Sequence, residues 1–131
     1  CKSDAQSFDL NSADDEKELE DVQNKEDPFM LTGGPPCERF SVLRNLSAEK
    51  RDPELDEAQM REARHLLMVA CRAYRRQYDR GRYFLHEHPW GAKSWYEECV
   101  QELLELPGVE QVVYVSRLCV DFTFNFHPMC N

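Results

Sequence analysis

The sequence has no long apolar run, few glycines and no closely spaced cysteine pair. No stretch approaches the ~20 apolar residues of a transmembrane helix, and residues 1–10 lack the basic start and apolar middle of a secretory signal. Only five glycines are present, and none precedes Gly33. The six cysteines include no Cys-x-x-Cys pair, which excludes a zinc deaminase signature and is unlike a disulfide framework. We therefore expect reduced cysteines in an intracellular protein, with no membrane partner and with the nucleus as one candidate compartment.

Acidic residues outnumber basic ones, and the excess lies near the N-terminus. The formal net charge is −9, and residues 1–31 hold ten acids and three lysines, so −7 falls there and −2 on the rest. Residues 1–27 are therefore predicted to form an acidic segment ahead of a core at 28–131. Such a charge disfavours non-specific nucleic-acid binding. Five arginines at 72, 75, 76, 80 and 82 are typical of a helix C-terminus, and a local basic surface is the alternative.

Strands and helices alternate along the predicted core, which has room for one domain. Residues 28–32 are predicted to be a strand, and Asp52-Pro53 a capped start of a long helix that ends near Gly81. A strand at 83–86 follows, then a helix to 107 opened by a capping box of Ser94 and Glu97, then strands at 109–115 and 118–124. This order predicts an α/β fold with a mostly parallel sheet and flanking helices.

Two loops of the predicted sheet carry reactive side chains. Cys37 follows the first strand, and Glu87, between His86 and His88, follows the second. Because ligands bind at the carboxyl ends of parallel strands, both loops are expected at one rim. A thiolate stabilised by a short following helix, together with a carboxyl group, is a plausible pair for covalent catalysis. The alternatives are a simple tight turn, a metal site of Cys37 with the two histidines, or a thiol hydrolase. No metal site is predicted.

The loop Gly33-Gly-Pro-Pro-Cys-Glu-Arg-Phe-Ser41 closely resembles the catalytic loop of cytosine-5 DNA methyltransferases, and Glu87 stands where that family has a base-contacting glutamate. The run from Asp27 to Trp95 also resembles a segment of retroelement-type polyproteins. The resemblance implies a Rossmann-like, methyltransferase-type fold.

The same resemblance implies the roles of individual residues. Cys37 would attack C6 of a flipped-out cytosine, Glu87 would hold or protonate N3, and S-adenosylmethionine would supply the methyl group for C5. The implied substrate-binding residues are Pro35, Pro36, Phe40, Ser41, His86 and His88, and the implied cofactor-binding residues are Asp9, Gly33 and Gly34.

Two parts of that family's pattern are absent from this sequence. The first strand with its Phe-x-Gly-x-Gly cofactor loop is missing, as is the later Gln-x-Arg-x-Arg segment. We therefore expect a methyltransferase-like fragment that is inactive alone and meets DNA through a longer parent protein. An unpaired sheet edge would favour oligomers. The competing hypotheses are a non-enzymatic α/β module of a retroelement polyprotein and a cysteine-dependent hydrolase.

Overall fold

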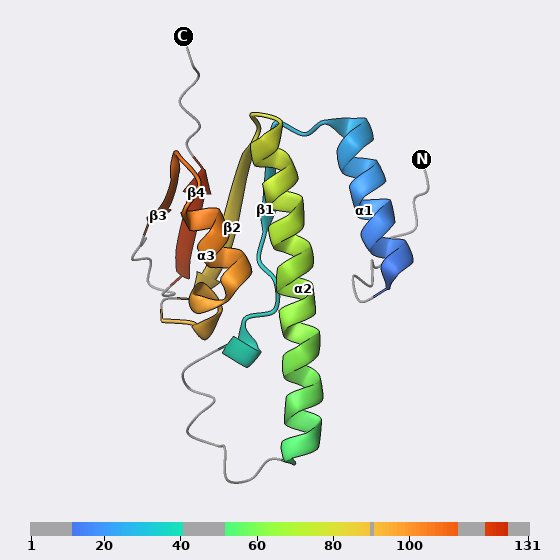
Figure 1. Ribbon diagram of the computed structural model, residues 1–131, viewed down its shortest axis with the longest axis vertical. Coiled ribbons are helices and arrows are strands. Elements are labelled where there is room, and N and C mark those ends of the chain that lie inside the picture. The colour runs from blue at the N-terminus through green and yellow to red at the C-terminus, as the bar shows by residue number, and fades with distance from the viewer. Residues whose placement is uncertain (1–11, 41–51, 90, 113–119, 126–131) are drawn as a thin grey trace.

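The computed structural model describes residues 12–40, 52–89, 91–112 and 120–125. In these residues helices and strands alternate, as an α/β class requires (Figure 1). The elements in chain order are α1 (Ala13–Glu26), β1 (Met30–Gly33), η1 (Glu38–Phe40), α2 (Pro53–Asp79), β2 (Tyr83–Pro89), η3 (Lys93–Tyr96), α3 (Glu98–Leu104), β3 (Val109–Val112) and β4 (Val120–Asn125).

The sheet is mixed, and the prediction of a mostly parallel sheet is wrong for the described strands. The strand order is β1-β2-β4-β3. Only β1 and β2 run parallel, with helix α2 as their crossover, whereas β4 is antiparallel to both β2 and β3. The physical reason is the short connection between β3 and β4, because strands joined without a long crossover pair antiparallel.

Strand β2 is longer than its sequence predicts. The sequence indicates an end at His86, because Pro89 and Gly91 follow, yet the strand continues to Pro89. Its last five residues pair with β4, from Leu85 opposite Phe124 to Pro89 opposite Val120. Those backbone partners hold the chain extended, and a proline is tolerated at the last position of a strand. Glu87 and both histidines therefore lie within a strand and not in the loop after it.

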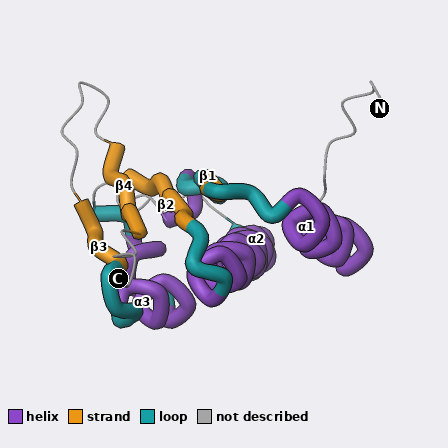
Figure 2. The backbone as a smooth tube through the Cα atoms, turned by 90° about the horizontal axis from the view of Figure 1, so that it is seen from above, coloured by secondary structure: helices purple, strands orange, loops and turns teal. Residues whose placement is uncertain are grey.

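The long helix α2 has the predicted start and packs over one face of the sheet. Asp52 caps it, with its side chain accepting a hydrogen bond from the Glu54 N–H at 3.0 Å, and Pro53 is its first residue. Helices α2 and α3 lie on the same side of the strands (Figure 2). Within the described residues, no helix is both long and apolar enough to cross a bilayer.

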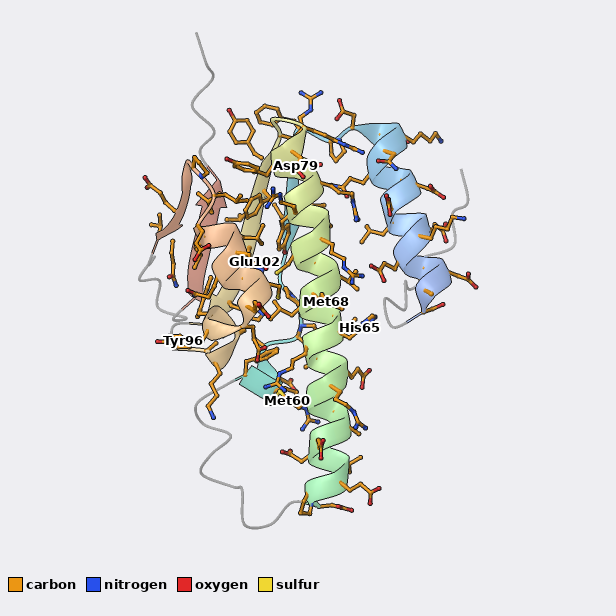
Figure 3. All side chains as sticks on the ribbon, viewed as in Figure 1. Met60, His65, Met68, Asp79, Tyr96 and Glu102 are labelled. Atoms are coloured by element: carbon orange, nitrogen blue, oxygen red, sulfur yellow. The ribbon has the colours of Figure 1, made fainter. Side chains whose placement is uncertain are left out.

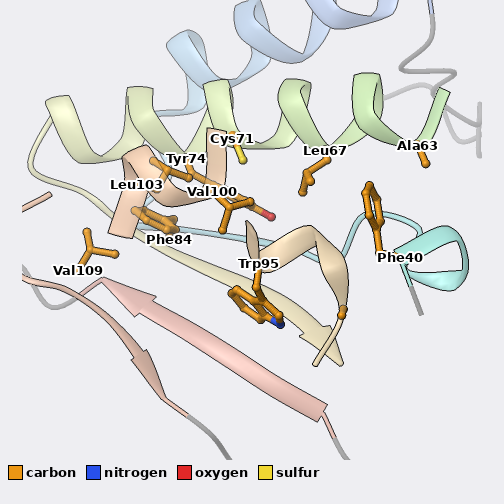
Figure 4. Packing of buried hydrophobic residues seen from close by; sticks show 11 residues of the cluster. Phe40, Ala63, Leu67, Cys71, Tyr74, Phe84, Trp95, Val100, Leu103 and Val109 are labelled. Atoms are coloured by element: carbon orange, nitrogen blue, oxygen red, sulfur yellow. The ribbon is translucent and has the colours of Figure 1, made fainter. Parts of the chain in front are cut away.

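The hydrophobic core lies between this helical layer and the sheet. Tyr74 of α2 stacks on Phe84 of β2, with ring centroids 5.1 Å apart. Trp95 approaches from η3, and Phe40 closes the end of the core near η1 (Figure 4). The other members of this cluster are Ala63, Leu67, Cys71, Ala92, Val100, Leu103 and Val109.

The acidic helix α1 packs on the arginine-rich half of α2. Gln23, the buried residue of α1, donates hydrogen bonds to the Ala73 carbonyl at 2.9 Å and to the Gln77 side chain at 2.8 Å. The arginines of α2 meet carboxylates of the N-terminal segment, as in the 2.8 Å pair of Arg72 with Glu16. The arginine cluster is therefore largely paired within the molecule, while the side chains of Arg72 and Arg75 stay 51% and 52% exposed. Helix α1 lies within the acidic segment predicted at residues 1–27.

Candidate functional site

The parallel pairing of β1 with β2 brings the Gly-Gly-Pro-Pro-Cys loop against the histidines and Glu87. Gly33 is the register partner of His86. The next residue, Gly34, lies beside β2, and a Cβ added there would be in ordinary contact with the Glu87 carbonyl oxygen at 3.5 Å. Two segments more than fifty positions apart thus share one edge of the sheet, as the parallel topology predicts.

His88 holds the loop in place from the buried side of β2. Its Nε2 lies 2.8 Å from the Pro35 carbonyl oxygen. Because a carbonyl only accepts, Nε2 carries the proton, and Nδ1 is left to accept from the Ser94 hydroxyl, with which it forms a short hydrogen bond. Burial lowers the pKa of His88, and the bond to Pro35 partly opposes that shift. A neutral imidazole of fixed tautomer therefore links η3 to the loop.

His86 lies beside His88 and is also buried, with 3% of its surface exposed. Its Nδ1 is 3.3 Å from the Tyr74 hydroxyl, and its Nε2 is buried without a hydrogen-bond partner. Burial, with a smaller contribution from His88, lowers the pKa of His86 to about 3. Burial also raises the pKa of Tyr74 above its usual value, and the charges of Cys71 and Glu87 add to that. His86 and Tyr74 are therefore both neutral near pH 7.

Gly33 is required by the packing of Tyr74. A Cβ at Gly33 would lie 2.3 Å from the Tyr74 hydroxyl oxygen and 3.2 Å from the ring carbon that bears it. Gly33 has no positive φ, so the requirement is for space and not for backbone conformation. The side of Gly33 that faces the helix is therefore filled by the protein's own tyrosine.

The two predicted catalytic residues lie at this edge but do not touch through their side chains. Cys37 is half-buried, and its carbonyl accepts a hydrogen bond from the Phe40 N–H at 3.0 Å, which begins the turn η1. Glu87 is half-buried and alternates with the inward-facing histidines, so it points to the opposite face of β2. Among the contacts of the described residues, no hydrogen bond or ion pair joins Cys37 to Glu87. The helix expected after Cys37 is one 3₁₀ turn.

The residues predicted to bind substrate divide into buried supports and accessible positions. Phe40, His86 and His88 are at most 3% exposed, so they support the loop and have almost no surface for a ligand. Pro35 is half-buried, and Pro36 is exposed. Ser41 and Asp9 lie outside the described residues.

The same contacts argue against the hydrolase and metal hypotheses. A thiol hydrolase needs an imidazole that can take a proton from the cysteine. Both ring nitrogens of His88 are already engaged, and those of His86 are turned into the core. In the part of the chain that the structure describes, no group of three or more histidine, cysteine or acidic side chains could hold a metal ion.

Tyr74 and Ser94, which contact the two buried histidines, could not be identified as such from the sequence. Tyr74 belongs to the apolar stripe of α2 and resembles any other core residue there. The prediction that Ser94 opens a capping box is wrong: α3 begins only at Glu98, its N-cap Glu97 forms no side-chain cap, and Ser94 instead bonds to His88. The alternation of His86 and His88 along a strand is the signal that both rings point inward.

Replacing Ser94 by alanine is expected to lower the free energy of unfolding by about 1–2 kcal/mol, because Nδ1 of His88 would become a buried acceptor without a donor. Urea denaturation followed by circular dichroism measures this. Ser12→Ala is the matched control, since the Ser12 side chain forms no capping hydrogen bond at α1. Equal stability of the two variants would contradict a role of Ser94 in holding His88.

Comparisons with protein-family models, with curated proteins and with the solved structures give no match to this chain. The functional interpretation therefore depends on the geometry of the site and on the loop motif.

Proposed function

We propose that this chain is the catalytic-loop half of a methyltransferase-like domain related to the cytosine-5 DNA methyltransferases, and that it does not transfer a methyl group by itself. One observation carries the proposal. The Gly33–Cys37 loop and Glu87, which resemble the two catalytic motifs of that family, lie side by side because β1 pairs in parallel with β2. The shared sheet edge is also where α/β folds bind ligands.

The chemistry proposed for this edge is thiol addition to a pyrimidine ring. The Cys37 thiolate forms a bond to C6 of cytosine, and the displaced electron pair moves toward N3, where the Glu87 carboxyl group donates a proton or hydrogen bond. C5 then becomes nucleophilic and can take up a proton or another electrophile. Loss of a proton from C5 and expulsion of the thiolate restore the ring. His88 positions the loop through Pro35 and takes no part in the proton transfers.

The described residues do not fit the methyl donor. Gly33 and Gly34 are the glycines that the resemblance assigns to S-adenosylmethionine. The space where a Gly33 side chain would lie is filled by Tyr74. The corresponding position at Gly34 faces the backbone of Glu87. We propose that other parts of a parent protein bind the methyl donor.

The shape of the sheet supports an incomplete domain. Strand β1 stands at one end of the strand order and pairs only with β2 among the described strands. Phe29 and Met30, at this edge of the described sheet, are 69% and 49% exposed, and neighbouring exposed apolar side chains can mark an interaction surface. Sheets that combine parallel with antiparallel strands are common in doubly wound and α+β folds. We infer that further strands of a parent domain pair with β1, with self-association as the alternative at the same edge.

The proposed addition predicts a reaction that needs no methyl donor. An oligonucleotide with one cytosine, incubated with the full chain in deuterated water, should gain deuterium at C5, because the adduct makes that carbon exchangeable. Mass spectrometry of the recovered nucleoside measures the exchange. Cys37→Ser is expected to abolish it, and Glu87→Gln to slow it at least tenfold, in line with the 10²–10⁴-fold usual for general acids.

The outcome decides between the proposal and the non-enzymatic alternative. Glu110→Gln is the matched control for Glu87→Gln, because Glu110 is an exposed glutamate on β3, away from the loop. If the wild type exchanges deuterium no faster than Cys37→Ser, the chain is a non-enzymatic structural module.

Titration calorimetry with S-adenosylhomocysteine is expected to show no saturable binding at millimolar ligand. Saturable binding would contradict the proposal that the cofactor site is incomplete.

A further inference from the structure

Two thiols, Cys71 and Cys99, lie on the helical side of the molecule, apart from Cys37. Cys71 of α2 is 4% exposed and belongs to the core, whereas Cys99 of α3 is half-buried. Helix α2 packs against helix α3, and the two thiols influence each other's pKa across that contact. Both line one open cavity of about 490 Å³ between α2 and α3. Met68 and Glu102, from the two helices, mark this region in Figure 3.

The two thiols differ in accessibility and in acidity. The hydrogen bond donated by Cys71 lowers the pKa of Cys99, and the same bond, together with burial, raises the pKa of Cys71. Cys99 is therefore the nucleophile that a small molecule in the cavity would meet first. The cavity is open and its wall is mostly apolar, and five charged side chains also line it (Arg72, Arg75, Arg76, Glu98 and Glu102).

We propose that Cys71 and Cys99 form a reversible disulfide when a peroxide enters the cavity between α2 and α3. The Cys99 thiolate attacks one peroxide oxygen, the O–O bond breaks, and hydroxide leaves, so that Cys99 becomes a sulfenic acid. The Cys71 thiol then attacks the Cys99 sulfur, its proton passes to the departing hydroxide, and water leaves. Overall, two thiols are oxidised to one disulfide, and one hydrogen peroxide is reduced to two waters.

The geometry makes this bond easy to form in the folded state. The two thiols line one cavity from two helices that pack together, so they can approach to the ~2.05 Å of a disulfide bond without a change of fold. The bond would join α2 to α3, two elements that already pack together in the core. It is independent of the proposed methyltransferase chemistry, because neither cysteine lies at the sheet edge that carries Cys37 and Glu87.

Tryptic digestion can locate the bond without ambiguity. Cleavage after Arg64, Arg72, Lys93 and Arg117 gives peptides 65–72 and 94–117, which contain Cys71 and Cys99 respectively as their only cysteines. The full chain is treated with equimolar hydrogen peroxide, blocked with an alkylating reagent and digested. We expect the linked pair 65–72/94–117 to be the dominant crosslink, to disappear on treatment with dithiothreitol, and to be absent in Cys71→Ser and Cys99→Ser. Cys37→Ser is expected to retain it.

Two further measurements keep the test decisive if a serine variant folds poorly. Phenylarsine oxide, which bridges two adjacent thiols, should bind the reduced wild type in a one-to-one ratio and fail to bind after peroxide treatment. The oxidised wild type should melt several degrees above the reduced protein, because a crosslink restricts the unfolded chain. Two results would overturn the proposal. One is a mixture of crosslinks among all the cysteines, as expected for an unfolded chain. The other is oxidation of Cys99 to a sulfinic acid with no bond to Cys71.

Discussion

Acidification from pH 7 to pH 5 is expected to lower the free energy of unfolding by about 2 kcal/mol through His86 alone. The buried ring has a pKa of about 3 in the folded protein, against 6.5 for an unperturbed histidine. The unfolded state therefore binds more protons than the folded state at every pH between these values. The stabilisation is complete above pH 6.5 and is lost as the pH falls toward 3. His88, whose pKa is also lowered by burial, adds to the loss in the same direction.

Urea titrations at a series of pH values measure this slope. Because carboxylates also titrate in acid, the informative quantity is the difference between wild type and His86→Gln, in which the slope between pH 7 and pH 5 should be flatter even if the variant is less stable overall. His65→Gln is the matched control, since His65 projects from the side of α2 turned away from α3 (Figure 3). Equal slopes for wild type and His86→Gln would show that His86 is not buried in its neutral form.

Gly33→Ala is expected to lower the free energy of unfolding by about 3 kcal/mol, the upper part of the range for overpacked cores. The new methyl group would overlap the Tyr74 hydroxyl, whose oxygen would be 2.3 Å from the alanine Cβ. Tyr74 cannot move away cheaply, because its ring stacks on Phe84 and its hydroxyl contacts His86. The adjacent Gly34→Ala is the matched control: its nearest neighbour would lie at 3.5 Å, an ordinary contact, so a small effect is expected.

A double-mutant cycle with Tyr74→Phe identifies the cause of that loss. Removing the hydroxyl takes away the closest contact of the new methyl group and leaves the ring carbon at 3.2 Å. Gly33→Ala should therefore cost less in the Tyr74→Phe background, by about 1 kcal/mol or more, as neighbouring residues couple. Chemical denaturation of the four proteins supplies the values. An unchanged cost would mean that Gly33 is required for a reason other than Tyr74.

Elements with strong local signals are predicted well by the sequence. The start of α2 follows from Asp52 and Pro53, because a capping side chain and a proline at the first helical position act within one turn. The strand-helix-strand unit of β1, α2 and β2 follows from alternating apolar patterns. The position of Cys37 and Glu87 at one edge then follows from parallel pairing alone.

Features that depend on distant partners are not predicted. The extension of β2 through Glu87 to Pro89 requires β4, which comes more than thirty residues later in the chain. Ser94 begins a capping-box motif, but its hydroxyl forms a hydrogen bond with the buried ring of His88 and does not cap a helix. In both cases a local preference worth about 1 kcal/mol is overridden by satisfying buried polar groups, whose loss costs more.

The sequence by itself determined the α/β class, the acidic composition of the N-terminal residues, the long capped helix and the loop motif on which the proposed thiol chemistry depends. The tertiary structure alone decided the mixed pairing of the sheet, the docking of α1 on the arginines of α2 and the burial of both histidines. It also showed that the absence of a side chain at Gly33 leaves the space that the Tyr74 hydroxyl occupies. The difference is physical: propensities and caps act between neighbours in the chain, whereas strand order, ion pairing and desolvation arise between residues that only folding brings together.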